Sequence, residues 1–171
     1  MRAAGVSLWL IPSGAIRHEL RERIEALARR FATPAFEPHV TLVGGVSVSE
    51  ALAREAAASV ARGTRAFPLL FVSTAHSEDY FRCIVLEADL SSTLAAAHKA
   101  ALTALGVTSA PPFHPHLSLV YGSLLANTRT TVCAELASLC PLSCDAGSIE
   151  VAETDGAVES WRTVQSISLS G

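Results

Sequence analysis

The sequence is short of aromatic side chains and has no excess of basic charge. Only 6% of its 171 residues are aromatic although 50% are hydrophobic, so we expect a core of aliphatic side chains and alanine-rich helices packed on a sheet. Lys and Arg number 13 against 16 Asp and Glu, which gives a net charge of −3. Proteins that grip long nucleic acids usually have a basic surface. The balance therefore favours a small phosphate-bearing substrate and no extended nucleic acid as partner.

Long apolar runs are also missing. No segment approaches the roughly 20 apolar residues that a membrane-spanning helix needs, so we expect no membrane partner. The apolar segment at 6–11 is short and lacks both a basic leader and a small-residue cleavage site, so we interpret it as a first strand rather than a signal peptide.

The four cysteines lack the C-x-x-C spacing of a paired site. Cys140 and Cys144 are separated by Pro141, which argues against one helix that carries both, and Cys83 and Cys133 stand alone. We expect reduced structural thiols in a cytoplasmic, monomeric protein, with a disulfide as the alternative.

Hydrophobic periodicity and turn residues predict an α+β fold with mostly antiparallel pairing in one domain spanning 1–171. Ser13, Ser49 and Ser91 stand where the N-caps of three helices are expected, and a fourth helix is predicted at 128–139. Strands are predicted at 6–11, 39–43, 67–75, 80–88, 116–121, 148–153 and 161–169, with Gly44-Gly45 closing the second of them.

One short segment occurs twice. Residues 38–45 (PHVTLVGG) align without gaps to residues 115–122 (PHLSLVYG), with Pro, His, Leu, Val and the final Gly identical. His116 follows His39 by 77 positions, close to half the chain, and a helix is predicted after each copy. A duplicated strand-helix unit would place the two strands at related positions in two pseudo-symmetric lobes around a central cleft, with the helices outside.

Within each copy the spacing of the polar residues has a physical meaning. Side chains two apart on a strand point to the same face. His39 therefore shares a face with Thr41, and His116 shares one with Ser118, while the apolar residues between them face the other way. If the two strands adjoin, two imidazoles and two hydroxyls converge on one space.

That set of groups suits hydrolysis of a strained cyclic phosphodiester. One neutral imidazole can take a proton from the attacking water, and the other, as imidazolium, can protonate the leaving ribose oxygen, because the ordinary pKa of histidine is near working pH. Thr41 and Ser118 can donate hydrogen bonds to the non-bridging oxygens. The alternative is that descent from one lobe kept the histidines for packing, but packing does not require an imidazole and a hydroxyl repeated on one face.

Other histidines offer weaker candidates. His114 and His116 could form a metal site with His39, but neither repeated segment contains a carboxylate or a cysteine to complete it, so we predict no metal and no cofactor. His114 is otherwise a loop residue at the mouth of the cleft. His18 and His98 fall in predicted helices, where we expect them to be solvated.

Two arginines could bind a second phosphate of the substrate. Arg82 and Arg162 are the candidates, and an ion-paired or solvated role is the alternative for each.

At the two H-x-[ST] motifs the chain resembles the 2H phosphoesterase superfamily, and most closely its cyclic phosphodiesterase branch. The stretches at 7–12, 80–83, 97–99 and 161–162 are also similar to that branch. The resemblance implies a bilobal fold and the opening of nucleoside 2′,3′-cyclic phosphates to 2′-phosphates. It also implies hydrolysis of ADP-ribose 1″,2″-cyclic phosphate, a by-product of tRNA splicing, to the 1″-phosphate.

The resemblance further implies that Trp9 and Tyr121 bind substrate. Simple alternation places Tyr121 on the face opposite His116, so it reaches the cleft only if the strand ends or bulges there.

Two other functions stay open at this point. One is a 2′-5′ oligonucleotide phosphodiesterase or RNA-ligase-like enzyme, which should need a longer and more basic groove. The other is a nucleotide-binding module without catalysis, which intact histidines and hydroxyls in both motifs do not favour. Which histidine is the base and which the acid is also open, because the two copies are nearly equivalent.

Overall fold

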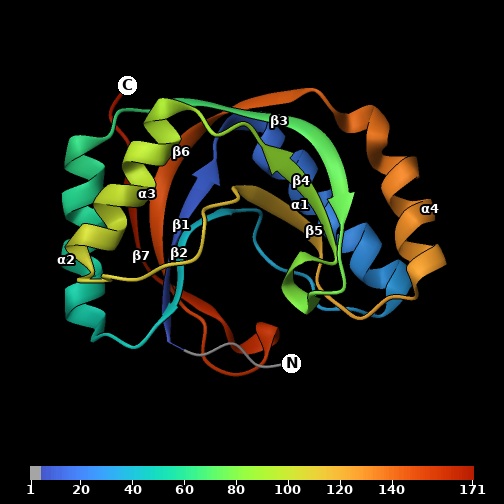
Figure 1. The fold of residues 1–171 in the computed structure, drawn as a ribbon, viewed down its shortest axis with the longest axis horizontal. Helices are drawn as coiled ribbons and strands as arrows, with labels where there is room; N and C mark the ends of the chain where they lie inside the picture. Colours follow the sequence, from blue (N-terminus) through green and yellow to red (C-terminus); the bar gives the residue numbers. More distant parts are fainter. Residues whose placement is uncertain (1–4) are drawn as a thin grey trace.

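A computed structural model describes residues 5–171 as an alternation of strands and helices (Figure 1). This arrangement confirms the predicted α+β class. The elements are β1 (Val6–Pro12), α1 (Gly14–Phe31), β2 (Val40–Val46), α2 (Glu50–Gly63), β3 (Phe67–His76), β4 (Ile84–Ala88), α3 (Ser92–Ala104), β5 (His116–Val120), α4 (Ala126–Leu136), β6 (Leu142–Glu153) and β7 (Arg162–Ser168).

The strands form one seven-stranded sheet in the order β1-β2-β5-β4-β3-β6-β7, and β1 also pairs with β6, so the sheet closes on itself. Every pairing between these strands is antiparallel, as predicted. The first part of β6 pairs with β3, and the remainder pairs with β1 and β7. The two strands of the repeated motif, β2 and β5, are direct neighbours. The division into two duplicated lobes within one domain stays a prediction.

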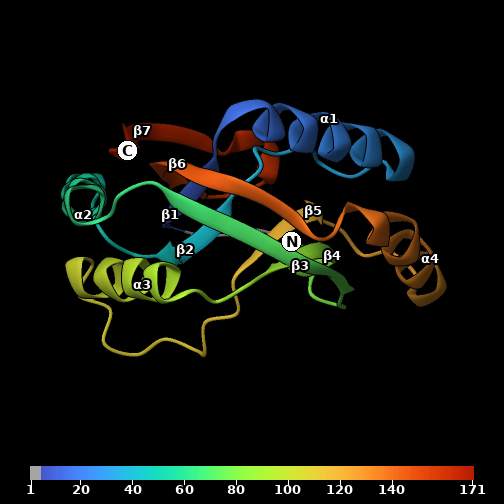
Figure 2. The same ribbon diagram turned by 90° about the horizontal axis from the view of Figure 1, so that it is seen from above.

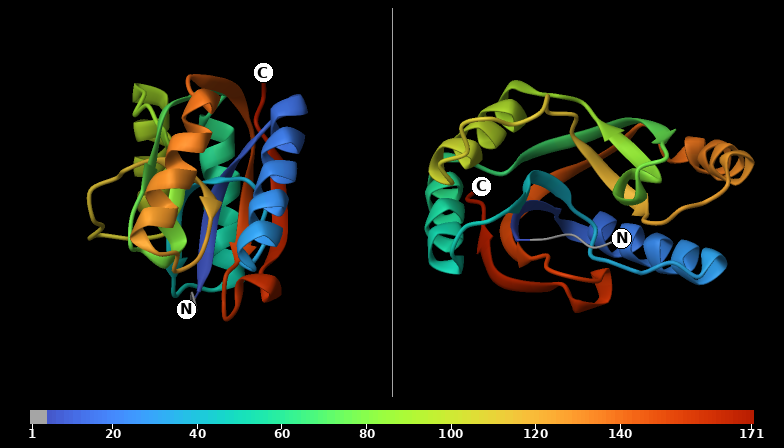
Figure 3. Two further views of the ribbon diagram at one scale, coloured as in Figure 1. Left: turned by 90° about the vertical axis from the view of Figure 1, so that its right-hand side faces the viewer. Right: turned by 60° about the horizontal axis from the view of Figure 1, so that its bottom comes forward.

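Apolar side chains from the strands and helices meet in one core. The residues predicted to face away from the histidines are buried there, with Val40 and Leu117 fully buried and Leu42 and Leu119 2% and 1% exposed. Helices α2 and α3 lie side by side at one end of the sheet, and α4 lies at the other (Figure 2). The C-terminal end of α1 lies at the same end of the molecule as α4 (Figure 3). Arg30 of α1 forms an ion pair with Glu135 of α4 at 2.6 Å.

All three serines stand at the predicted N-cap positions, and two of them form the capping hydrogen bond. Ser49 and Ser91 each accept a backbone N–H three residues on, at 3.2 Å. Ser13 is also at the predicted N-cap position of α1, with extended backbone, but its side chain makes no capping hydrogen bond. Ser13 instead packs against Gly147, where an added Cβ would lie 2.6 Å from the Ser13 Cβ, and its N–H donates to the Asp145 carbonyl at 2.9 Å. The residue serves the β1–β6 contact rather than the helix.

Three strand boundaries differ from the prediction by more than one residue. The strand expected at 80–88 begins only at Ile84, because Asp79 caps a 3₁₀ helix at Tyr80–Arg82 by accepting the Phe81 N–H at 2.9 Å. Gly44-Gly45 does not close β2, which runs on to Val46 through an irregularity in its pairing with β1. β6 starts at Leu142 instead of 148, since pairing with β3 extends it.

The four cysteines are free thiols, and Cys83 and Cys144 are buried. Burial raises the pKa of Cys144 to about 11, so this thiol is protonated and inert at neutral pH. Among residues 5–171, no helix combines the length and the apolarity required to cross a bilayer.

Candidate active site

The two motif strands adjoin at the point where their polar residues lie. Val40 on β2 pairs with Leu117 on β5. Continuing this antiparallel register by one residue in each direction sets His39 opposite Ser118 and Thr41 opposite His116. Residues directly opposite each other point to the same face of a sheet, so the imidazoles and hydroxyls of both motifs share one face.

Both imidazoles are held by the same backbone device. The Nδ1 atom of His39 lies 2.6 Å from the Glu37 carbonyl, and that of His116 lies 2.8 Å from the His114 carbonyl. A carbonyl can only accept, so Nδ1 donates in both rings and the neutral tautomer keeps its lone pair on Nε2. The proline between each pair fixes φ of the intervening residue, which explains its place in the motif.

His39 sits in an aromatic enclosure and is only 4% exposed. Its ring stacks on Trp9, with centroids 3.9 Å apart and planes at 16°, and the Tyr121 hydroxyl lies 3.2 Å from Nε2. Burial lowers the pKa of His39 from 6.5 to about 4, and the nearby His116 acts in the same direction, while the bond to the Glu37 carbonyl opposes the change. His39 is therefore neutral at pH 7.

His116 is only half-buried and has charged neighbours. Burial lowers its pKa, and so does the Arg82 guanidinium, whereas the hydrogen bond to His114 and the carboxylates of Asp79 and Glu87 raise it. Glu87 lies directly beside His116 in the β4–β5 pairing. The net effect is a pKa of His116 below the ordinary value for histidine, and the two carboxylates limit the decrease.

Tyr121 reaches the site although simple alternation points it away. β5 ends at Val120, and its pairing with β4 shifts register between Ile84 and Val85. The strand therefore both ends and bulges just before Tyr121, which is the condition under which this side chain can reach the cleft. The Tyr121 ring stacks on Phe36 at 3.7 Å. Burial raises the pKa of Tyr121, so its hydroxyl stays protonated and donates a hydrogen bond to Nε2 of His39.

The acidic side chain before the first motif is tied to α1. The Glu37 carboxylate accepts a hydrogen bond from Arg17 at 2.7 Å and another from Arg21. Glu37 is also the residue whose carbonyl holds His39. The corresponding residue of the second motif is His114, whose side chain is exposed. The two residues whose carbonyls hold the imidazoles, which we call the anchors, therefore differ in rigidity.

A cavity of about 350 Å³ opens beside His39. Of the predicted site residues it is lined by Trp9, His39, Thr41 and Tyr121, whereas His116 and Ser118 lie outside its lining. Ser118 is 4% exposed and its hydroxyl donates to the Phe81 carbonyl at 2.8 Å.

Sequence reasoning missed several of the residues that line this cavity. Phe81 and Trp161 add two rings, and Ser7 and Thr154 add two hydroxyls. Phe81 and Trp161 fall in stretches similar to the cyclic phosphodiesterase branch, which was a usable signal. Ser7 shares the strand face of Trp9 by simple alternation, while nothing local marks Thr154.

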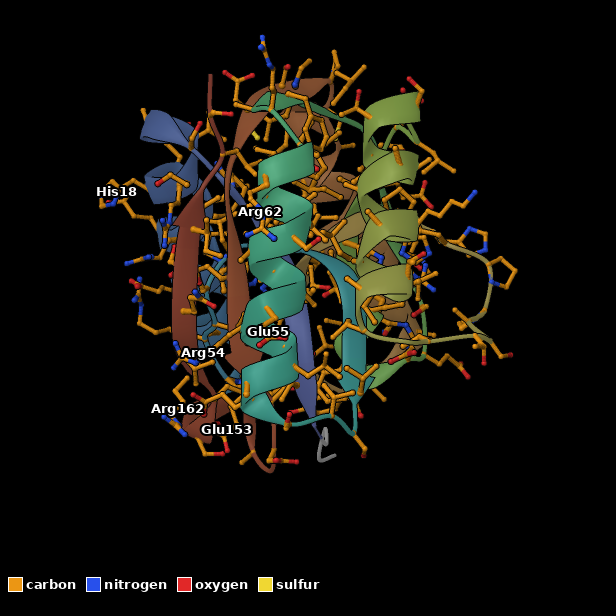
Figure 4. The ribbon with its side chains drawn as sticks, turned by 90° about the vertical axis from the view of Figure 1, so that its left-hand side faces the viewer. His18, Arg54, Glu55, Arg62, Glu153 and Arg162 are labelled. Carbon is orange, nitrogen blue, oxygen red and sulfur yellow. The ribbon has the colours of Figure 1, made fainter. Side chains whose placement is uncertain are left out.

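The other residues considered from the sequence are found in different surroundings, some exposed and some packed against the sheet. His18 is exposed on α1, with 74% of its side chain accessible, and Arg162 pairs with Glu153 at the surface (Figure 4). His98 was expected to be solvated, and this is wrong: its Nδ1 lies 2.7 Å from the Leu42 carbonyl on β2, and its ring stacks on Phe113. Within the described part of the chain, no cluster of three or more His, Cys, Asp or Glu side chains is placed to hold a metal ion.

Comparison with known proteins decides the family. Residues 3–169 match the family described as cyclic phosphodiesterase-like protein. The chain belongs to this family. It is thus a phosphodiesterase-type hydrolase of the 2H phosphoesterase class, as the two motifs predicted.

Individual relatives agree with this membership. A cyclic phosphodiesterase of Arabidopsis thaliana is 24% identical over 165 residues, which cover 92% of this chain and 91% of the relative. The structure of E. coli LigT in complex with 3′-AMP has a TM-score of 0.64 at 16% identity and covers 97% of this chain and 98% of its own. LigT in complex with NADP+ gives 0.65 at 15% identity, with both chains covered completely (100% each). These two structures share the fold.

Proposed function

We propose that this member of the family hydrolyses small cyclic phosphodiesters, with nucleoside 2′,3′-cyclic phosphates converted to 2′-phosphates by His39 and His116 without a metal ion. The observation that carries the proposal is the repeated anchor: two imidazoles lie on adjoining strands, and in each a backbone carbonyl fixes Nδ1 and leaves the lone pair on Nε2, which in His39 accepts from Tyr121. ADP-ribose 1″,2″-cyclic phosphate is the second substrate class that the resemblance implies.

The unequal surroundings of the histidines favour one assignment of roles. His39, held neutral by burial, takes a proton from the attacking water as the water oxygen bonds to phosphorus. His116 also has a lowered pKa, because burial outweighs the opposing effects of the His114 carbonyl, Asp79 and Glu87, but it is less buried than His39. In this assignment it carries the proton that passes to the departing 3′ oxygen when the phosphorus–oxygen bond breaks. The free 3′ hydroxyl and the 2′-phosphate are the products.

Three hydroxyls support the phosphate in this scheme. Thr41 shares the face of the imidazoles, and Ser118 and Tyr121 can turn from the Phe81 carbonyl and from His39 to the non-bridging oxygens. Hydrogen bonds that form as negative charge develops on these oxygens lower the barrier.

The 2′-5′ oligonucleotide alternative, which also fits the fold, gains no support from the charge of the chain. The net charge is −3, and among residues 5–171 the lining of the cavity contains no Lys or Arg, while its histidine, His39, is neutral at pH 7. A non-catalytic binding module would not need two imidazoles that are both anchored through Nδ1.

Product analysis tests the proposal. Incubation with 2′,3′-cyclic nucleotides should give 2′-phosphates, and activity should survive EDTA. Formation of 3′-phosphates would show that the 2′ oxygen, and not the 3′ oxygen, is the leaving group. Loss of activity in EDTA, restored by a divalent cation, would replace the two-histidine scheme with metal chemistry.

A further inference from the structure

Two buried hydroxyls form one end of the cavity beside His39. Ser7 and Thr154 are 4% and 2% exposed, and both line the cavity together with Trp9 and Thr41. Ser7 precedes Trp9 by two positions on β1, so both side chains point to the same face and lie roughly 7 Å apart along the strand. Because Trp9 pairs with Thr41, this polar end is one step beyond the phosphate-binding hydroxyl of the first motif.

The hydrogen bonds that Ser7 and Thr154 make within the protein leave both hydroxyls able to accept, but not to donate, a further hydrogen bond. Thr154 donates its one hydroxyl proton to the Gly5 carbonyl at 3.0 Å, so in its 3.1 Å contact with Ser7 it must accept. Ser7 in turn accepts the Gly45 N–H at 3.1 Å. Both hydroxyl protons are thereby used within the protein, and each oxygen keeps one unfilled lone pair.

The remainder of the cavity is rich in aromatic rings, and its histidine is neutral at pH 7. Its rings come from Trp9, Phe81, Tyr121 and Trp161, and its lining within residues 5–171 contains no Lys, Arg, Asp or Glu. Such a space suits a planar, neutral group that stacks on rings. A second phosphate brings acceptors only, and it would meet acceptors at the polar end.

We propose that Ser7 and Thr154 select the base of the substrate by accepting a hydrogen bond from its exocyclic amino group. The inference rests on the proposed function and narrows it to nucleoside 2′,3′-cyclic phosphates with an amino-bearing base, in preference to ADP-ribose 1″,2″-cyclic phosphate. An amino group fills the unfilled lone pairs, whereas a keto oxygen at the same position is repelled by them.

The test compares 2′,3′-cyclic CMP with 2′,3′-cyclic UMP, because cytosine has an amino donor at position 4 beside an acceptor N3, whereas uracil has a keto acceptor at position 4 beside an N3–H donor. We expect wild-type kcat/KM to favour the cytidine substrate by about tenfold. Thr154→Val removes the hydroxyl at nearly constant volume and should bring the ratio close to one. Thr154→Ser keeps the hydroxyl and should keep the ratio. Ser7→Ala is the second variant, and thermal melting shows which of the three are folded.

Equal kcat/KM for the two substrates in the wild type, or a cytidine preference that persists in folded Thr154→Val and Ser7→Ala, would overturn the inference. Binding of 2′-CMP and 2′-UMP, measured by calorimetry, separates this failure from failure of the proposed function. Tighter binding of 2′-CMP that depends on Thr154, without any turnover of cyclic nucleotides, would disprove the proposed reaction and still support base selection by Ser7 and Thr154.

Discussion

The two H-x-[ST] motifs have the same backbone and different surroundings. In each, a proline-fixed carbonyl holds Nδ1 of the histidine. Beyond that device His39 is enclosed by aromatic rings and capped by Tyr121, while His116 is half-buried among charged side chains. The repeat thus sets the positions of the imidazoles, and the segments outside the repeat make them unequal.

Removal of either imidazole should have the largest effect. His39→Ala and His116→Ala should each lower kcat/KM by at least ~10², because each loses one proton-transfer group. His18→Ala, a substitution at an exposed position on α1, is the matched control and should keep full activity. Near-normal turnover by either folded site variant would show that the motifs are not a catalytic pair.

The pH dependence of kcat/KM sharpens the comparison. A base must be unprotonated, so the acidic limb of the profile reports the pKa of His39, which lies near 4. We expect activity to hold as the pH falls below 6 and to drop only as it approaches 4. A profile that already declines with rising pH just above 4 would instead assign the acid role to His39.

The same pKa predicts a loss of stability in mild acid. The unfolded chain binds a proton at His39 near pH 6.5, and the folded protein binds it only near 4, so stability present at neutral pH falls as the pH drops from 6.5 to 4. The full difference corresponds to about 3 kcal/mol. Urea unfolding at pH 7 and pH 5 should show a smaller decrease for His39→Gln than for the wild type. An equal decrease in both proteins would place the protonation elsewhere.

The smallest effect should come from the anchors. Glu37→Gln weakens the ion pairs with Arg17 and Arg21 and leaves the carbonyl that holds His39 looser, so kcat should fall roughly threefold with little change in KM. The counterpart substitution His114→Ala removes an exposed side chain and keeps its carbonyl, and should leave kcat unchanged. Equal effects of the two substitutions would show that the anchors do not differ.

Period-two alternation was enough to predict the shared face of each histidine and hydroxyl, because it depends only on the strand. It failed for Tyr121, whose direction depends on a register shift against β4. It also missed Thr154, since this residue reaches the cavity through the pairing of β6 with β1, a contact between the two ends of the chain. Local patterns predict strand faces, while the walls of the cavity come from long-range pairing that no local pattern records.

The prediction of one continuous strand over Tyr80–Ala88 was wrong for a different reason. Apolar residues continue through Phe81, but Asp79 accepts its N–H and turns the chain into a 3₁₀ helix. That turn brings the Phe81 ring to the cavity and its carbonyl to Ser118. The capping aspartate was the signal that distinguishes the two readings.

A double-variant cycle tests most directly whether the two imidazoles act on one phosphate. Groups that act as a unit lose their joint contribution when either is removed. The account predicts that kcat/KM of His39→Ala/His116→Ala on 2′,3′-cyclic CMP equals that of the more impaired single variant within a few-fold. Losses that multiply, so that the double variant falls by the product of the single effects, would show two independent sites and contradict the account.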